Sequence, residues 1–191
     1  MRNEVGAFLI FAQNHCQKPN SITSISNDMS PWQAAAEVLR ITQVNYPPVS
    51  PEAVADKLNI PVFEWTLPDE ISGLFVSHED GVCIGVNQSH PKVRQRFTVA
   101  HELGHFVYSS GQDIFVDFTD SSSIDLHNDQ KRSAEKKANI FAADLLMPKI
   151  SLKKDFEKLG LEALTLLAQR YQVSEQALWF RLINLKLVQD V

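Results

Sequence analysis

The sequence has no long hydrophobic run and no excess of positive charge. No stretch approaches the roughly 18–20 consecutive apolar residues that span a bilayer, and the apolar segment 7–12 is too short for the core of a signal peptide. The 18 Lys and Arg against 23 Asp and Glu give a net charge of −5, whereas proteins that bind many nucleic-acid phosphates are basic. We therefore expect a cytoplasmic protein whose partner is neither a membrane nor a nucleic acid.

Cysteine is also scarce. Cys16 and Cys83 are too few for a disulfide framework or a four-cysteine metal site, and in a reducing compartment we expect them to be free thiols. The length of 191 residues and the hydrophobic content of 44% suffice for one good-sized core. We expect an N-terminal extension of unknown role over residues 1–29, a main domain over 30–150 and a helical C-terminal subdomain over 151–191.

Hydrophobic spacing predicts an α+β fold in which a small antiparallel or mixed sheet packs against a buried helix. Period-two alternation between Pro61 and Asn87, with a hairpin turn at Asp80-Gly81, predicts the sheet. Capping residues and helical periodicity predict the helices. The expected helices cover residues 30–43, 50–59, 91–109, 133–147, 161–171 and 174–187, and one more short strand covers 114–118.

The C-terminal tail is superficially similar to a helix-turn-helix, with the turn near residues 171–174. Its charge argues against DNA binding. From Ser151 onward six basic residues stand against five acidic ones, a net charge of only +1. We expect the tail to pack as helices or to recognise a protein.

The central motif is HELGH, from His101 to His105, inside the predicted helix 91–109. Histidines at i and i+4 lie one turn apart on the same helical face, which is about the separation that one zinc ion bridges. Glu102 is rotated about 100° from His101. Its carboxylate would lie beside the metal and take a proton from bound water instead of becoming a ligand.

Catalytic zinc normally has three protein ligands and one open position. A further histidine six residues after the motif is excluded, because Gly111 occupies that position. On the next predicted helix, Glu135 and Asn139 share a face, so that Glu135 can reach the metal and Asn139 can hydrogen-bond one of its ligands. Helix spacing alone fits equally well a solvated Glu135 that pairs with Lys131 or Lys136.

Two stretches strongly resemble the ImmA/IrrE family of metallopeptidases. They are RQRFTVAHELGH over residues 94–105 and EKKANIFAADLLMP over residues 135–148. The resemblance covers about residues 32–150 and, more loosely, 160–188. Lys137 departs from it, since many members carry an acidic residue there. The departure changes the local charge and leaves Glu135 in the ligand position.

The resemblance implies a gluzincin-like zinc endopeptidase. His101, His105 and Glu135 would bind one zinc ion per chain, Glu102 would polarise the attacking water, and Asn139 would support the ligands. Family members act on helix-turn-helix repressors and relieve repression of stress or mobile-element genes, which implies a repressor protein as substrate. The choice between zinc and manganese in the cell stays open. The alternative is a non-proteolytic regulator or toxin–antitoxin component that binds and sequesters a repressor.

Two weaker expectations concern the reaction itself. Tyr108, His127 and Arg132 lie in plausible segments for stabilising a developing oxyanion, and no spacing argument chooses among them. The strand over residues 82–87 directly precedes the metal helix. We expect it to form an exposed edge that could pair with an extended substrate.

Overall fold

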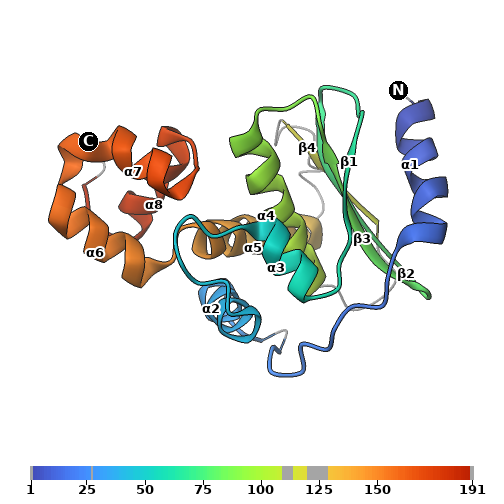
Figure 1. The fold of residues 1–191 in the computed structure, drawn as a ribbon, viewed down its shortest axis with the longest axis horizontal. Coiled ribbons are helices and arrows are strands. Elements are labelled where there is room, and N and C mark those ends of the chain that lie inside the picture. The colour runs from blue at the N-terminus through green and yellow to red at the C-terminus, as the bar shows by residue number, and fades with distance from the viewer. Residues whose placement is uncertain (1, 27, 109–113, 120–128, 190–191) are drawn as a thin grey trace.

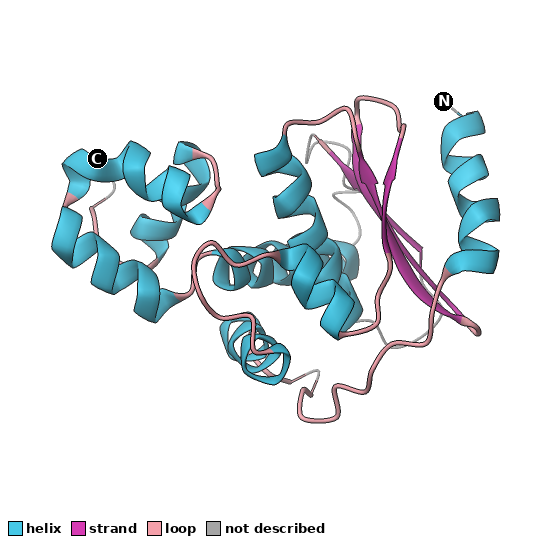
Figure 2. Cartoon of the chain, in the orientation of Figure 1, coloured by secondary structure: helices cyan, strands magenta, loops and turns pink. Residues whose placement is uncertain are grey.

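The structure is a computed structural model that describes residues 2–26, 28–108, 114–119 and 129–189. The fold is α+β, as predicted: a four-stranded sheet separates helix α1 from helix α4 (Figure 1). Figure 2 distinguishes helices, strands and loops. The elements are α1 (Arg2–His15), α2 (Pro31–Thr42), α3 (Pro51–Lys57), β1 (Val62–Trp65), β2 (Ile71–His78), β3 (Gly81–Asn87), α4 (Lys92–Tyr108), β4 (Ile114–Phe118), α5 (Asp129–Leu146), α6 (Lys149–Leu159), the short 3-10 helix η2 (Leu161–Ala163), α7 (Leu164–Tyr171) and α8 (Glu175–Asn184).

The sheet has the strand order β1-β3-β2-β4. β2 and β3 form the predicted antiparallel hairpin, β1 pairs with β3 in parallel, and β4 pairs with β2 antiparallel. The expectation that residues 82–87 form an exposed edge is therefore wrong. Strand β3 has β1 on one side and β2 on the other. Every residue of β3 is buried, and its continuous apolar run is typical of a strand whose two faces are both covered. The edge strands of the described sheet are β1 and β4.

The main core lies on the α4 side of the sheet. It joins apolar side chains of α2, α3, β3, α4 and α5 with those of the C-terminal helices, where Leu152, Leu167 and Leu182 are fully buried. The tail thus shares its core with the rest of the protein. Helix α6 was not predicted, because its lysine-rich sequence buries only Leu152.

Helix α1 lies in the N-terminal extension over residues 1–29, where the sequence patterns predict neither a helix nor a strand. It covers the face of the sheet opposite α4 (Figure 1). Phe8 and Ala12 are fully buried there, against a second apolar cluster that includes Leu74 and Val76 of β2. A sheet face of this kind would otherwise be exposed to water, and its burial stabilises α1.

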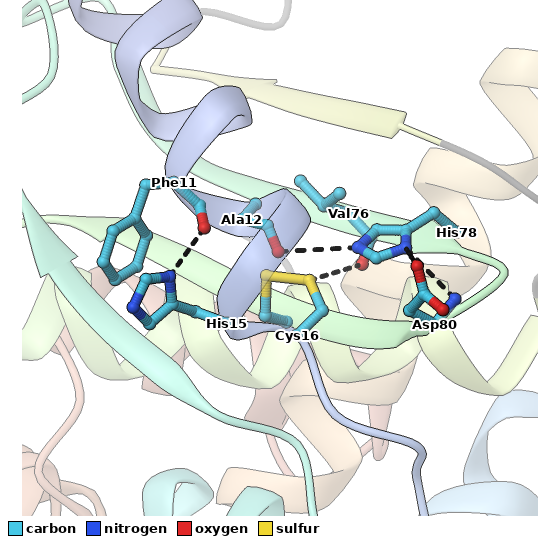
Figure 3. Close-up of a disulfide and its surroundings, with 8 residues drawn as sticks. Phe11, Ala12, His15, Cys16, Val76, His78 and Asp80 are labelled. Atoms are coloured by element: carbon cyan, nitrogen blue, oxygen red, sulfur yellow. Dashed lines mark hydrogen bonds and ion pairs between the residues drawn. A yellow bond between two sulfur atoms is a disulfide. The ribbon is translucent and has the colours of Figure 1, made fainter.

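The two cysteines are paired, so the expectation of free thiols is wrong in this structure. A disulfide joins Cys16, directly after α1, to Cys83 of β3 across 67 residues of sequence (Figure 3). Next to it, the backbone of Gln17 exchanges two hydrogen bonds with that of Val82, at 3.1 and 2.8 Å. The C-terminal end of α1 is consequently fastened to the central strand both covalently and by backbone pairing.

The remaining local predictions are confirmed. Ser30 and Gln33 interact at the start of α2, where the Ser30 backbone N–H donates to Gln33 Oε1 at 3.1 Å. β4 has the predicted bounds, and α5 begins at Asp129, about one turn before the predicted start. None of the helices in the described part of the chain combines the length and apolar character of a membrane span. A cytoplasmic location stays a prediction.

Candidate metal centre

The site forms where α4 and α5 pack closely against each other. Gly104 of α4 faces Ala138 of α5, and a Cβ added to Gly104 would lie only 2.8 Å from the Ala138 Cα. A larger side chain at position 104 would force the two helices apart. The glycine inside the HELGH motif therefore allows a carboxylate on α5 to reach the imidazoles on α4.

Three side chains from these two helices converge. His101 Nε2 lies 3.2 Å from Glu135 Oε2, His105 Nε2 lies 3.3 Å from Glu135 Oε1, and the two Nε2 atoms are 3.0 Å apart. Each residue offers one ligand atom, and these atoms all lie within 4.8 Å of one another. The structure brings together all three predicted ligands, and Glu135 reaches the imidazoles instead of a surface lysine.

Asn139 lies one turn beyond Glu135 on the same face of α5. Its Oδ1 is 3.1 Å from His101 Nδ1. With the proton on Nδ1, His101 donates to this amide oxygen and leaves the Nε2 lone pair directed at the site. Asn139 thus has the supporting position expected from the sequence.

Glu102 is fully buried beside this group, and neither of its carboxylate oxygens has a hydrogen-bond partner within the described residues. Burial, together with the negative charges of Asp117 and Glu135, raises the pKa of Glu102 well above its ordinary value of 4.5. A buried carboxylate without partners is costly in a protein of purely structural design. The arrangement suits a group that accepts a proton from a molecule bound in the site.

The charges of the three converging side chains influence one another. Burial alone would raise the pKa of Glu135, but hydrogen bonds from His101 and His105 hold it at about 2. Burial opposes the charged form of His101, yet Glu135 and Asp117 outweigh this and raise its pKa. Burial lowers the pKa of His105. Glu135 is consequently an anion over the whole physiological range of pH.

These residues fit a single divalent ion. Two imidazole nitrogens and one carboxylate oxygen are a common donor set of catalytic zinc. In a tetrahedral zinc site with bonds of about 2.0–2.1 Å, ligand atoms lie roughly 3.3 Å apart. The observed separations of 3.0, 3.2 and 3.3 Å are close to that value. The orphaned carboxylate of Glu102 would have a metal-activated water as its partner.

Two residues of the edge strand β4 belong to the site and were not found from the sequence. The ring of Phe115 stacks on His105, with centroids 4.1 Å apart and planes at 16°. Asp117 is mostly buried on the same face of β4, and its burial raises the pKa of its carboxyl. In the sequence, the one sign of a role for Asp117 is that it is the carboxylate of a short aromatic strand, residues 114–118. The strand pairing that turns Asp117 toward α4 involves distant segments, so it cannot be predicted from the neighbouring residues.

The candidates for an oxyanion donor have different positions. The hydroxyl of Tyr108 donates to the backbone oxygen of Met29 at 3.2 Å, and the Lys137 ammonium lies 5.2 Å from its ring centroid. Arg132 is exposed. His127 lies outside the described residues. Neither Tyr108 nor Arg132 is placed in the group around the imidazoles.

The helix-borne histidines, the carboxylate from a second helix and the buried glutamate beside them form a group that is compatible with one metal ion. Residues 55–182 match the peptidase family described as the IrrE N-terminal-like domain. The match spans more than half of the chain, and the protein belongs to this family.

Individual relatives agree with that assignment. Over 99 residues, the chain is 31% identical to the radiation response metalloprotease IrrE of Deinococcus radiodurans, in a match that covers 51% of this chain and 29% of the relative. The chain thus spans less than a third of that relative's length. A solved structure of a Mycobacterium tuberculosis transcriptional regulator has the same fold, with a TM-score of 0.56 and 18% identity, over 84% of this chain and 47% of its own.

Proposed function

We propose that this protein is a zinc-dependent endopeptidase that cleaves a helix-turn-helix transcriptional repressor and so relieves repression of stress or mobile-element genes. The observation that carries the proposal is the convergence of two imidazoles and a carboxylate within 4.8 Å, next to a buried and unpartnered glutamate. Membership of a peptidase family and likeness to a metalloprotease support hydrolysis of a protein. The repressor as substrate is supported by the resemblance of the two motif stretches.

His101, His105 and Glu135 would hold the ion, which supplies Lewis-acid polarisation of the scissile carbonyl and acidifies a water molecule. Glu102 accepts the proton of the attacking water and passes it to the leaving amine. Its raised pKa favours holding that proton between the two transfers. Asn139 keeps His101 in the tautomer whose Nε2 is free.

The test is coexpression with a helix-turn-helix repressor from the same genome, followed by analysis of the repressor on a gel and of a reporter it controls. The wild type should cleave the repressor and relieve repression, whereas Glu102→Gln should bind zinc and leave the repressor intact. Glu37→Gln, a change on α2 outside the group around the imidazoles, is the matched control and should cleave normally. Equal relief by wild type and Glu102→Gln, without cleavage, would favour sequestration of the repressor.

A further inference from the structure

The edge strand β4 places two side chains over the metal centre. Alternate residues of a strand share a face. Phe115 stacks on His105 of α4, so Asp117, two residues further on, lies on the same α4-facing side. Phe115 also packs against Phe75 of the neighbouring strand β2, with ring centroids 6.1 Å apart. The packing of Phe115 therefore fixes the face of β4 on which Asp117 lies.

Strand pairing places Asp117 next to Glu102. Asp117 is the register partner of Gly73 in β2, and the Cβ positions of directly paired residues lie about 5 Å apart on the same face. A Cβ added to Gly73 would lie 3.1 Å from Glu102 Oε1. Gly73 thus leaves the space in which the carboxylates of Asp117 and Glu102 come close to each other.

A β-bulge brings a positive charge to the same place. The register shifts between Ile71 and Gly73, which leaves Ser72 as the extra residue of β2. Arg94 of α4 donates to the Ser72 hydroxyl from Nη2 at 2.7 Å and from Nε at 3.2 Å. This contact holds the guanidinium where its charge acts on Asp117. Within the described residues, the side chain of Asp117 makes no hydrogen bond or ion pair.

The site therefore gathers three carboxylates, on Glu102, Asp117 and Glu135, near one guanidinium. With neutral imidazoles, the fully ionised group carries two negative charges in excess. A divalent ion would bring the total to zero. Asp117 is not among the three residues whose ligand atoms lie within 4.8 Å of one another, so its contribution is its charge and not a bond to the ion.

We propose that Asp117 is a positioning residue of the metal centre: its carboxylate, on the face of β4 that Phe115 packs against α4, balances the charge of the bound ion and strengthens its binding. This inference rests on the proposed function, since it assumes the metal. It gives β4 a role beyond closing the sheet. It also predicts opposite effects of one substitution on the metal-free and the zinc-bound protein.

The test uses the full chain with Asp117→Asn, which keeps the shape and removes the charge. In the metal-free protein the variant should raise the thermal midpoint by about 2–5 °C, because it removes a charge that burial and, to a smaller extent, the neighbouring carboxylates disfavour. Its zinc affinity, measured by competition with a chromophoric chelator, should fall by roughly tenfold, as is common for supporting residues around a metal. A merely structural Asp117 would instead lower the metal-free midpoint.

Two further variants make the result unambiguous. Asp117→Glu restores the charge and should recover most of the zinc affinity. Asp56→Asn removes the same charge from an exposed position on α3 and should change neither quantity. Zinc affinity of Asp117→Asn within twofold of the wild type, or a lowered metal-free midpoint, would overturn this inference. The proposed function fails separately, if the wild type itself does not bind zinc.

Discussion

At the scale of single residues, the cost of the site is concentrated on Glu102. Its two oxygens are buried without partners in the described protein, and its charge is close to those of Asp117 and Glu135. Burying such a group lowers the stability of the metal-free fold. The same features suit it to carry a proton during hydrolysis, so stability and function place opposite demands on this position.

Glu102→Gln should therefore stabilise the metal-free protein in a pH-dependent way. Because the pKa of Glu102 is raised above 4.5 in the folded state, the unfolded chain ionises first and wild-type stability falls as the pH rises from about 4.5 toward the folded pKa. The variant lacks this loss. Its thermal midpoint should exceed that of the wild type by about 2–6 °C at pH 8 and by less at pH 5.

Scanning calorimetry of both metal-free proteins at the two pH values checks this expectation. The variant keeps His101, His105 and Glu135, so the difference between the two proteins reports the titration of Glu102. A difference between the midpoints that is the same at pH 5 and pH 8, or a variant that is less stable at pH 8, would show that Glu102 is not a costly buried charge.

Some residues of the site follow from the sequence and others do not. The HELGH spacing places both imidazoles on one helical face, and the i, i+4 relation of Glu135 and Asn139 does the same on α5, because helix geometry is local. The role of Asp117 cannot be predicted from local geometry. It joins the site through its register with Gly73 and a bulge in β2, which depend on pairing between distant segments.

At the scale of elements, hydrophobic periodicity and capping predict most helices and strands, because these signals are short-range. Helix α1 was missed, since its buried side chains, such as Phe8, find their partners only on the far face of the sheet. The central position of β3 was missed for the same reason: strand order is a tertiary property. The pairing of Cys16 with Cys83 could not be judged across 67 residues without the fold.

The attachment of α1 yields a prediction for the disulfide. Cys16→Ser should lower the free energy of unfolding under non-reducing conditions by about 2–4 kcal/mol, because the cross-link restricts the unfolded chain over a loop of 67 residues. Urea denaturation measures the loss. Hydrogen exchange should show it first in α1, whose contacts are confined to one face of the sheet.

The wild type treated with a phosphine reductant provides the internal comparison. It should match Cys16→Ser, while the variant itself should not respond to the reductant. A wild type whose stability is unchanged by complete reduction, confirmed by thiol titration, would show that the disulfide does not hold α1 in place.

At the scale of the whole molecule, a buried ion pair connects α5, the helix that carries Glu135, to the tail. Arg181 of α8 donates to Asp144 of α5 and to the backbone oxygen of Met147, at 3.2 Å from both Nε and Nη2. The side chains of Arg181 and Asp144 are 6% and 9% exposed, so neither charge is well solvated alone. The tail is therefore docked specifically onto the helix that carries Glu135.

Removing one partner of this ion pair should lower the stability of the fold. Arg181→Met should lower the free energy of unfolding by about 3–5 kcal/mol, because Asp144 is left buried and unpaired. The double variant Arg181→Met/Asp144→Asn should lose less, since it removes the uncompensated charge. Arg170→Met breaks an ion pair with Asp155 whose arginine is 53% exposed, and should cost at most about 1 kcal/mol. Equal losses in Arg181→Met and Arg170→Met would contradict specific docking.

The central claim is that two imidazoles on α4 and one carboxylate on α5 bind a divalent ion. The most direct measurement is the metal content of the purified full-length chain by mass spectrometry after zinc loading and desalting. Wild type and Glu102→Gln should each retain one zinc per chain, and Glu135→Ala should retain far less. A wild type without metal, or a Glu135→Ala variant that keeps a full equivalent, would contradict the account.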